Sequence, residues 1–259
     1  MRALLFPMEL TPGMVAIVVI GVFLASFVDG VAGGGGIISV PTYFFAGLPA
    51  HLALGTNKLS SCIGTAVSTG RFIRSGYVNW KLGVPSIALA LVGAALGTRL
   101  QLMVSERALQ ILLLAVLPVV AVVVLRQRKL PEEPGDIAPG KQAFIVLSAA
   151  FVVGAYDGFY GPGTGTFLIL IYCGPGRLDL RTASGNVKLV NLASNLGALF
   201  TSLINGQVFL VLGLIGAGSS VLGHWLGSGL AIRDGSRIAR PMILIVLALL
   251  AVKVITELV

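Results

Sequence analysis

The sequence predicts an all-α polytopic membrane protein made of two homologous repeats that are inverted relative to each other. Of its 259 residues, 56% are hydrophobic and only 11% are charged, whereas soluble domains carry about 25% charged residues. Apolar runs alternate with short polar loops, and residues 126–141 form the one long polar stretch. A Gly-rich motif that starts with aspartate occurs twice, at Asp29–Gly36 and Asp157–Gly165. We therefore expect an N-terminal half (1–125), a linker and a C-terminal half (142–259) in one membrane domain.

Ten apolar segments are expected, five on each side of the linker. A full span needs about 20 residues, and the first two segments of each half are shorter than that. Each short pair could form a re-entrant hairpin with a buried Gly-rich tip, or two squat spans. The prediction is eight full spans plus short Gly-interrupted segments, or ten spans. The expected segments are Met14–Val28, Ile37–Leu48, His51–Ile73, Val78–Leu100, Ala108–Leu125, Ala143–Tyr156, Thr166–Cys173, Thr182–Leu203, Val208–Ile232 and Ile238–Ile255.

An internal repeat supports this division. At an offset of 130, residues 53–100 match residues 183–230 at twelve positions. These include Lys58/Lys188, and the two glycines of Gly93-x-x-x-Gly97 align with those of Gly223-x-x-x-Gly227. The acids Asp29 and Asp157 correspond at an offset of 128. We expect the Gly-x-x-x-Gly pairs to be packing seams. Five segments per half is an odd number, so the second repeat should be inverted in the membrane.

The basic residues agree with the inverted arrangement. With the linker 126–141 in the cytoplasm, twelve basic residues fall inside and four outside, as the positive-inside rule requires. This places both termini outside and predicts a multi-pass protein of the inner cell membrane. Because the net charge of +8 comes from short loops, nucleic acid is not an expected partner. No cleaved signal peptide is expected, since residues 1–12 lead into the first apolar run without an Ala-x-Ala cleavage site. No metal site or cofactor is expected either, since the two cysteines form no cluster with histidine.

The two Gly-rich tips are the expected binding site. Each tip stands directly before a new apolar segment, and free N–H groups at a helix start attract anions. Two such starts, brought together by inverted symmetry, would form a common electropositive pocket near the membrane midplane. Close helix packing is the alternative role for the glycines. The candidate residues are Gly33, Gly34, Gly35 and Gly36 in the first tip and Gly161, Gly163, Thr164 and Gly165 in the second.

Charged residues inside the apolar segments form a second set of candidates. Lys58 and Lys188 are expensive in lipid, so they either attract an anionic substrate or pair with Asp29 and Asp157, and the two roles are compatible. The two aspartates are the only acids within the segments. Each either binds a proton that couples transport to a proton gradient, or caps its loop by accepting backbone N–H bonds.

A polar face runs along the third segment of each half. Ser61/Asn191 and Thr65/Asn195 correspond between the repeats and recur at i, i+4, so they share one helix face. This face either lines a pore or makes interhelical hydrogen bonds. His51 and His224 are isolated in the sequence, and we expect no ligand role for them. Substrate orientation is assigned to Thr56, Asn57, Asn186 and Asn191; the remaining polar residues of the face are Ser60 and Ser68.

At these motifs the chain resembles the TauE/SafE family of sulfite exporters. The resemblance rests on Asp29–Pro41 and Leu54–Leu59, and on their echoes at Asp157–Gly165 and Ala183–Leu189. It implies transport, usually export, of small sulfur-containing anions such as sulfite or organosulfonates. The second tip departs from the first, with proline and threonine where the first has glycines. A stiffer second loop and an asymmetric site are therefore expected.

We thus expect a secondary transporter and no enzymatic activity, with no catalytic residues. Its partners would be a small anion and the lipid bilayer, with or without proton coupling; monomer and homo-oligomer both stay open. One alternative is a passive anion channel. Another is an intramembrane aspartyl protease that uses Asp29 and Asp157 as a dyad, although the Gly-x-Gly-Asp context of such enzymes is missing.

Overall fold

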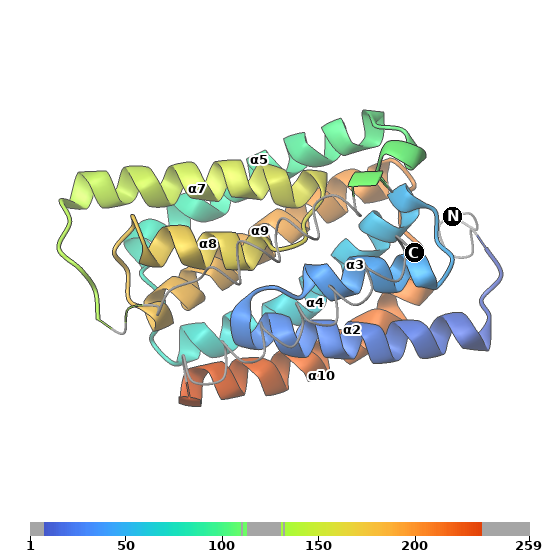
Figure 1. The fold of residues 1–259 in the computed structure, drawn as a ribbon, viewed down its shortest axis with the longest axis horizontal. Coiled ribbons are helices and arrows are strands. Elements are labelled where there is room, and N and C mark those ends of the chain that lie inside the picture. Colours follow the sequence, from blue (N-terminus) through green and yellow to red (C-terminus); the bar gives the residue numbers. More distant parts are fainter. Residues whose placement is uncertain (1–7, 110, 113–130, 132, 235–259) are drawn as a thin grey trace.

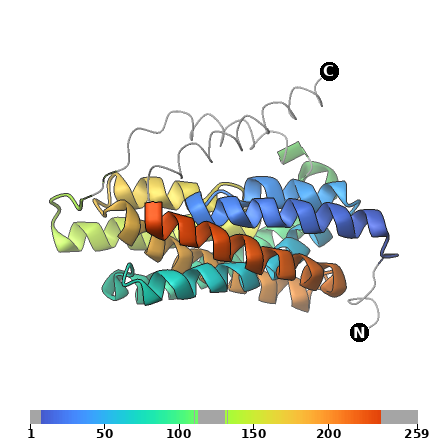
Figure 2. The ribbon, with the colours of Figure 1, turned by 90° about the horizontal axis from the view of Figure 1, so that it is seen from below.

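The computed structural model describes residues 8–109, 111–112, 131 and 133–234, which form a bundle of helices lying along one long axis (Figures 1 and 2). No strand occurs in these ranges. The predicted segment 238–255, most of segment 108–125 and part of the linker lie outside the described residues. The helices are α2 (Pro12–Ala32), α3 (Gly36–Phe45), α4 (Ala50–Arg74), α5 (Trp80–Met103), α7 (Pro139–Phe159), α8 (Thr164–Cys173), α9 (Leu180–Ile204) and α10 (Leu210–Asp234).

The first helix of each half is longer than the sequence suggested. Helices α2 and α7 each have 21 residues, enough to cross a bilayer, so the prediction that these segments are short was wrong. Both continue through their Asp-Gly pair, because neighbouring helices bury the glycines and leave the backbone bonds intact. Helix α2 ends only where Gly33 adopts φ 77°. The short elements are α3 and α8, with 10 residues each.

Five of the described helices are long and apolar enough to cross a membrane: α2, α5, α7, α9 and α10. Helix α4 has 25 residues but carries many polar side chains, most of them buried against its neighbours. This is the pattern of a multi-pass membrane protein in which α4 lies inside the bundle. The described helices match the expected segments in type and order.

The two halves contain helices of matching length in the same order: 21 and 21, 10 and 10, 25 and 25, and 24 and 25 residues. In Figure 1, α2 runs from the right of the view to the left, whereas α7 runs from left to right. Helix α5 packs along α7 and α9, and α10 packs along α2 and α4. The last described long helix of each half thus lies against the first helix of the other.

Glycines allow these two seams to close. A Cβ added to Gly97 of α5 would lie 1.9 Å from the carbonyl oxygen of Ala155 in α7. A Cβ on Gly227 of α10 would lie 2.2 Å from the carbonyl oxygen of Phe27 in α2. No larger residue fits at such distances, so the Gly-x-x-x-Gly pairs are packing seams, as predicted.

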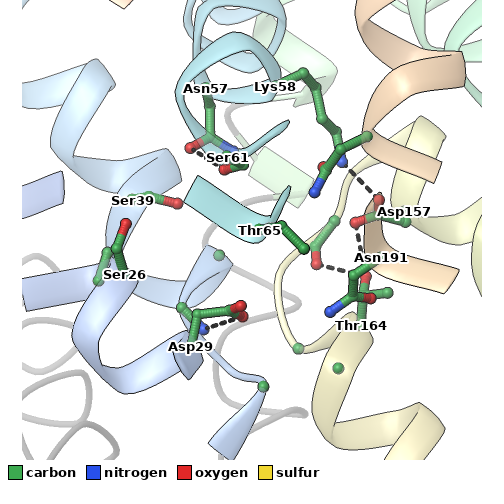
Figure 3. A pocket seen from close by; sticks show the side chains of 18 of the residues that line it. Ser26, Asp29, Ser39, Asn57, Lys58, Ser61, Thr65, Asp157, Thr164 and Asn191 are labelled. Atoms are coloured by element: carbon green, nitrogen blue, oxygen red, sulfur yellow. Dashed lines mark hydrogen bonds and ion pairs between the residues drawn. The ribbon is translucent and has the colours of Figure 1, made fainter. Parts of the chain in front are cut away.

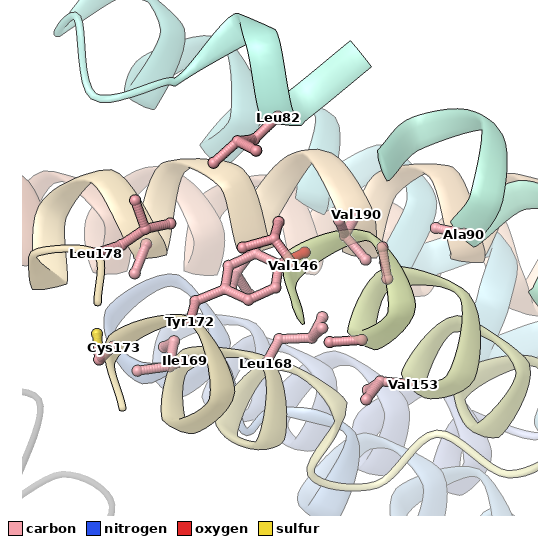
Figure 4. Close-up of a cluster of buried hydrophobic side chains, with 14 of the residues drawn as sticks. Leu82, Ala90, Val146, Val153, Leu168, Ile169, Tyr172, Cys173, Leu178 and Val190 are labelled. Atoms are coloured by element: carbon pink, nitrogen blue, oxygen red, sulfur yellow. The ribbon is translucent and has the colours of Figure 1, made fainter. Parts of the chain in front are cut away.

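Apolar clusters hold the two short helices in place. Around α8, the buried ring of Tyr172 packs among Leu82, Val146, Leu168 and Val190, which come from α5, α7, α8 and α9 (Figure 4). Around α3, the ring of Tyr43 takes the corresponding place in a cluster with Val18, Val22, Phe209 and Leu212. These clusters fix the starts of α3 and α8, where the Gly-rich tips lie.

Candidate functional site

The two Gly-rich tips lie in direct contact. A Cβ on Gly165 would be 2.0 Å from the carbonyl oxygen of Gly33, and one on Gly36 would be 3.3 Å from that of Gly161. Gly33, Gly161 and Gly163 have φ of 77°, 99° and 85°, a region that L-residues with side chains rarely adopt. Glycine is therefore required both by backbone conformation and by the approach of one tip to the other.

A cavity that is partly open to solvent lies beside the joined tips (Figure 3). Both halves contribute to its wall, and most of the lining side chains are polar. The residues come from α2, α3, α4, α7, α9, α10 and the tips. They are Ala25, Ser26, Asp29, Gly33, Gly35, Gly36, Ser39, Asn57, Lys58, Ser61, Thr65, Asp157, Gly161, Gly163, Thr164, Gly165, Asn191, Asn195 and His224.

Four of the predicted site residues do not line this cavity. Gly34 faces the Thr166 hydroxyl, which would lie 3.2 Å from an added Cβ. The Thr56 hydroxyl oxygen accepts the backbone N–H of Phe209 at 2.9 Å, and the Asn186 amide donates to the carbonyl of Thr182 at 2.9 Å. The fourth, Lys188, lies behind Asp29. Thr56 and Asn186 therefore hold loop and helix backbone in the described structure.

The starts of α3 and α8 present backbone N–H groups at the cavity. The N–H of Gly35 donates to Asp29 Oδ1 at 3.2 Å, so Asp29 caps its loop as one of the two interpretations predicted. The N–H groups of Gly36 and Gly165 have no hydrogen-bond acceptor among the described residues. The first N–H groups of a helix have no intrahelical partner and carry its positive dipole end. Two such ends converge on one wall.

Both lysines are ion-paired across the two halves. Lys58 Nζ lies 2.9 Å from Asp157 Oδ2, and Lys188 Nζ lies 2.8 Å from Asp29 Oδ2. Each pair joins a lysine of one half to the aspartate of the other. The four formal charges cancel, so these side chains do not make the pocket electropositive as expected. The helix starts, with their positive dipole ends, are then the remaining source of positive charge expected at the cavity.

Hydroxyl groups complete the surroundings of Asp157. The Thr164 hydroxyl donates to Asp157 Oδ1 at 2.9 Å, and the Ser194 hydroxyl donates to Oδ2 at 2.6 Å. Asp157 is 5% exposed, yet three donors satisfy its carboxylate: these two hydroxyls and the ammonium of Lys58. Thr164 is the residue that replaces a glycine of the first tip, and its hydroxyl makes the second tip chemically distinct, as expected.

The polar faces of α4 and α9 meet at the cavity. The predicted pairs Ser61/Asn191 and Thr65/Asn195 all line it. Asn191 Oδ1 is buried without a hydrogen-bond partner among the described residues. Ser60 and Ser68 instead make internal bonds, for example from the Tyr43 hydroxyl to Ser60 Oγ at 2.9 Å. The four paired residues thus line the cavity, Ser60 makes an interhelical bond, and the Ser68 hydroxyl donates to the carbonyl of Thr65 within its own helix.

Sequence reasoning missed His224. Its Nε2 lies 3.0 Å from Asp29 Oδ2, and the ring lines the cavity, so the prediction that it is isolated was wrong. It reaches Asp29 because α10 packs along α2, a contact that no local pattern reveals. One signal was available: His224 follows Gly223 directly, in the Gly-x-x-x-Gly seam. His51 lies elsewhere, with Gln101 and Glu106 at the start of α4.

Comparison with known proteins decides the family. The family model described as sulfite exporter TauE/SafE matches residues 17–254. The chain belongs to the TauE/SafE family. Curated relatives include the "Probable membrane transporter protein ORF9" of Sinorhizobium sp, 32% identical over 94% of this chain and 93% of that protein. YfcA of Escherichia coli K12, named as a probable membrane transporter protein, is 32% identical over 95% and 91%. No solved structure gives a significant match.

Membership of the TauE/SafE family is consistent with the chemistry of the two aspartates. A proteolytic dyad requires two carboxylates that share a proton, whereas Asp29 and Asp157 are each bound to a lysine and no hydrogen bond joins them in the described structure. Among the described residues, no group of three His, Cys, Asp or Glu side chains is arranged to hold a metal ion. The hydroxyl, amide, ammonium and backbone N–H groups that line the cavity are hydrogen-bond donors.

Proposed function

We propose that this protein is a secondary transporter that exports a small sulfur-containing anion, such as sulfite or an organosulfonate. The single observation that carries the proposal is the convergence of two helix starts, those of α3 and α8, on one cavity between the halves. A cluster of N–H groups at helix ends binds anionic oxygens without any net charge on the side chains. The family name and the names of the relatives favour transport.

In this proposal the N–H groups of Gly36 and Gly165 bind the oxygens of the anion. The side chains of Asn191, Thr164 and Lys58 complete the site, since all three line the cavity. Lys58 reaches the anion by exchanging its bond to Asp157, so the carboxylate competes with the substrate for the same ammonium group. Such competition keeps binding weak enough for release, which a carrier requires.

We further propose that the halves are inverted repeats of five membrane segments each, with the linker 126–141 in the cytoplasm and the protein in the inner membrane. The packing suggests two moving bodies. One contains α2, α3, α4 and α10, and the other contains α5, α7, α8 and α9; α4 meets α9 between them. Lys58–Asp157 and Lys188–Asp29 each cross from one body to the other. Alternating access then comes from rocking these bodies about the shared site.

The test is transport by the purified protein in liposomes. We expect saturable uptake of radiolabelled sulfite or sulfoacetate and counterflow, in which unlabelled anion inside accelerates entry of label. Asn191→Leu keeps the side-chain size, removes the amide, and should lower exchange about tenfold, the effect of about 1.4 kcal/mol. Asn205→Leu, at the exposed end of the same helix, should leave exchange unchanged.

Flux that does not saturate and shows no counterflow would identify a passive channel instead. Absence of any flux of either anion in the wild type, with nucleoside or amino-acid flux present, would reject the proposed substrate class. Equal exchange by wild type and Asn191→Leu would remove the amide of Asn191 from the site.

A further inference from the structure

We propose that His224 binds the proton that couples anion transport to a proton gradient, with Asp29 as its partner. This inference rests on the proposed function and adds the coupling ion and its site. In the described structure His224 is 2% exposed and lies on α10 at the cavity wall. The sequence analysis assigned such a role to the aspartates. The geometry points instead to the imidazole of His224, which lies between Asp29 and the hydroxyl of Ser220.

The ring has one nitrogen with a fixed role. Nε2 lies 3.0 Å from Asp29 Oδ2, and a carboxylate accepts hydrogen bonds, so Nε2 carries hydrogen in both states of the ring. Lys188 Nζ donates to the same oxygen at 2.8 Å. Asp29 therefore orients the imidazole, and the exchangeable proton resides on the other nitrogen, Nδ1.

Nδ1 lies where it can be satisfied with or without a proton. The carbonyl oxygen of Ser220 is 3.1 Å away and the Ser220 hydroxyl oxygen is 3.3 Å away. In the neutral ring, the hydroxyl donates to Nδ1. In the imidazolium, Nδ1–H donates to the carbonyl, and the hydroxyl turns to Ser26 Oγ at 2.7 Å. No buried group loses its hydrogen bond in either state, so proton binding needs no rearrangement of the helices.

Two serines form a path from the cavity to Nδ1. Ser26 lines the cavity, and its hydroxyl contacts that of Ser220, which contacts Nδ1. A proton that arrives at Ser26 Oγ releases the Ser26 proton to Ser220 Oγ, which in turn releases its own proton to Nδ1. Each hydroxyl gains one proton and gives up one, so the relay is balanced and only the imidazole changes charge.

Charge balance links this proton to the anion. Two groups contact the His224 ring from the packed helices: Asp29 of α2 and Thr65 of α4. Lys188 of α9 lies on the far side of the Asp29 carboxylate, to which it is paired. Arg71 of α4 contacts Trp225, the residue next to His224. With a neutral ring, Asp29 and Lys188 cancel. The imidazolium leaves one uncompensated positive charge at the cavity wall, which an anion neutralises. By linkage, anion binding then promotes proton binding by the same factor.

The corresponding position in the other half lacks this device. At the offset of 130, His224 corresponds to Ala94 and Ser194 corresponds to Gly64. A Cβ at Gly64 would lie 2.6 Å from His224 Nδ1, so this glycine makes room for the ring. One proton site per protein follows for the described residues. A divalent anion that leaves with one proton still carries out one net negative charge, so an inside-negative membrane potential favours export.

The experiment separates exchange from coupling in liposomes that contain the full-length protein. Radiolabelled sulfoacetate serves as the probe because a sulfonate takes up no proton near neutral pH. Counterflow is measured at equal pH on both sides, and net accumulation is measured with an acidic exterior. We expect the wild type to do both. His224→Gln should retain counterflow and lose acid-driven accumulation by at least tenfold, whereas His51→Gln should behave as wild type in both assays.

Acid-driven accumulation by His224→Gln at the wild-type level would overturn the inference while leaving the proposed transport intact. Failure of wild-type counterflow would instead reject the proposed function. If His224→Gln does not fold, the wild-type protein in weakly buffered detergent solution still decides the matter. When sulfoacetate is added, the protein should take up protons from the solution, in an amount approaching one per protein. Absence of proton uptake at every pH between 5 and 9 (a range of roughly two units about the ordinary histidine value) would contradict the proposal.

Discussion

Asp29 and Asp157 occupy corresponding places in the two halves but have different surroundings. Both lie in the last turn of the first long helix, and both pair with a lysine from the other half. Asp157 is bound in addition by two hydroxyls, whereas Asp29 is bound by the imidazole of His224 and a backbone N–H. Asp157 is thus bound by a lysine and two hydroxyls, whereas Asp29 is bound by a lysine, an imidazole and a backbone N–H.

The difference extends along the helices that cover each acid. Four pairs of corresponding positions differ between the Asp29 side and the Asp157 side. Given with the Asp29 side first, they are Ser26/Gly154 at the offset of 128, and Gly64/Ser194, Ser220/Ala90 and His224/Ala94 at the offset of 130. The α5–α7 seam is thus closed by small apolar residues, while the α10–α2 seam contains a hydrogen-bonded chain. The surroundings of the two aspartates therefore differ, and the proposed proton site lies only on the Asp29 side among the described residues.

The largest expected effect comes from breaking the fixed pair. Lys58→Ala leaves Asp157 as a buried charge, since the two side chains are 6% and 8% exposed. Loss of one partner of a buried pair costs about 3–5 kcal/mol. Unfolding of the detergent-purified protein, followed by helical circular dichroism in a denaturant titration, should show this loss. The Lys58→Ala/Asp157→Ala double variant should recover part of it, and a double variant weaker than the single one would contradict the pairing.

Removal of Lys188 should be milder and should depend on pH. With His224 as the proton site proposed above, its imidazolium can still neutralise Asp29 in Lys188→Ala, so the loss should be about 2 kcal/mol while the ring carries its proton, close to one charged hydrogen bond. When the ring loses that proton at higher pH, the loss should grow toward that of Lys58→Ala. The same titration at a series of pH values measures this. A pH-independent loss would show that His224 does not respond to Asp29.

Ser194→Ala should cost less than either lysine change. It removes one of three donors to Asp157 and leaves the ion pair in place, so we expect a loss of about 1.5–3 kcal/mol, the range for hydrogen bonds to charged groups. Unlike Lys188→Ala, this loss should be constant across neutral pH. Ser202→Ala, a buried serine of the same helix, is the control. A loss that varies with pH as strongly as that of Lys188→Ala would mean that Asp157, too, has a partner whose charge changes.

The smallest effect is expected at the first tip. A Cβ at Gly36 would lie 3.3 Å from the carbonyl oxygen of Gly161, so Gly36→Ala should cost about 1 kcal/mol through overpacking. Gly70→Ala on α4, where nothing lies within 4 Å of the added atom, should be neutral or stabilising because alanine is the better helix former. Stabilisation by Gly36→Ala would show that the tips are further apart than described.

The sequence predicts which residues come together between the halves, but not which of them are in contact. The repeated Asp-Gly motifs and the lysines pointed to one pocket because unpaired charges and glycine runs are costly in lipid. The motifs do not tell which aspartate each lysine reaches, since this depends on how α4 and α9 cross. The length of α2 was underestimated because buried glycines are tolerated inside a packed helix. His224 was missed because the seam that brings α10 to α2 joins residues nearly two hundred positions apart.

The exchange of α5 and α10 between the halves has a consequence for biogenesis. As the chain leaves the ribosome, α2 enters the membrane first, but the helix that seals its glycine seam is synthesised after all the other described helices. Asp29 gains Lys188 only when α9 has been synthesised, and His224 only when α10 follows. Until then the carboxylate of Asp29 has neither of these partners, so the N-terminal portion alone cannot complete its charge pairing.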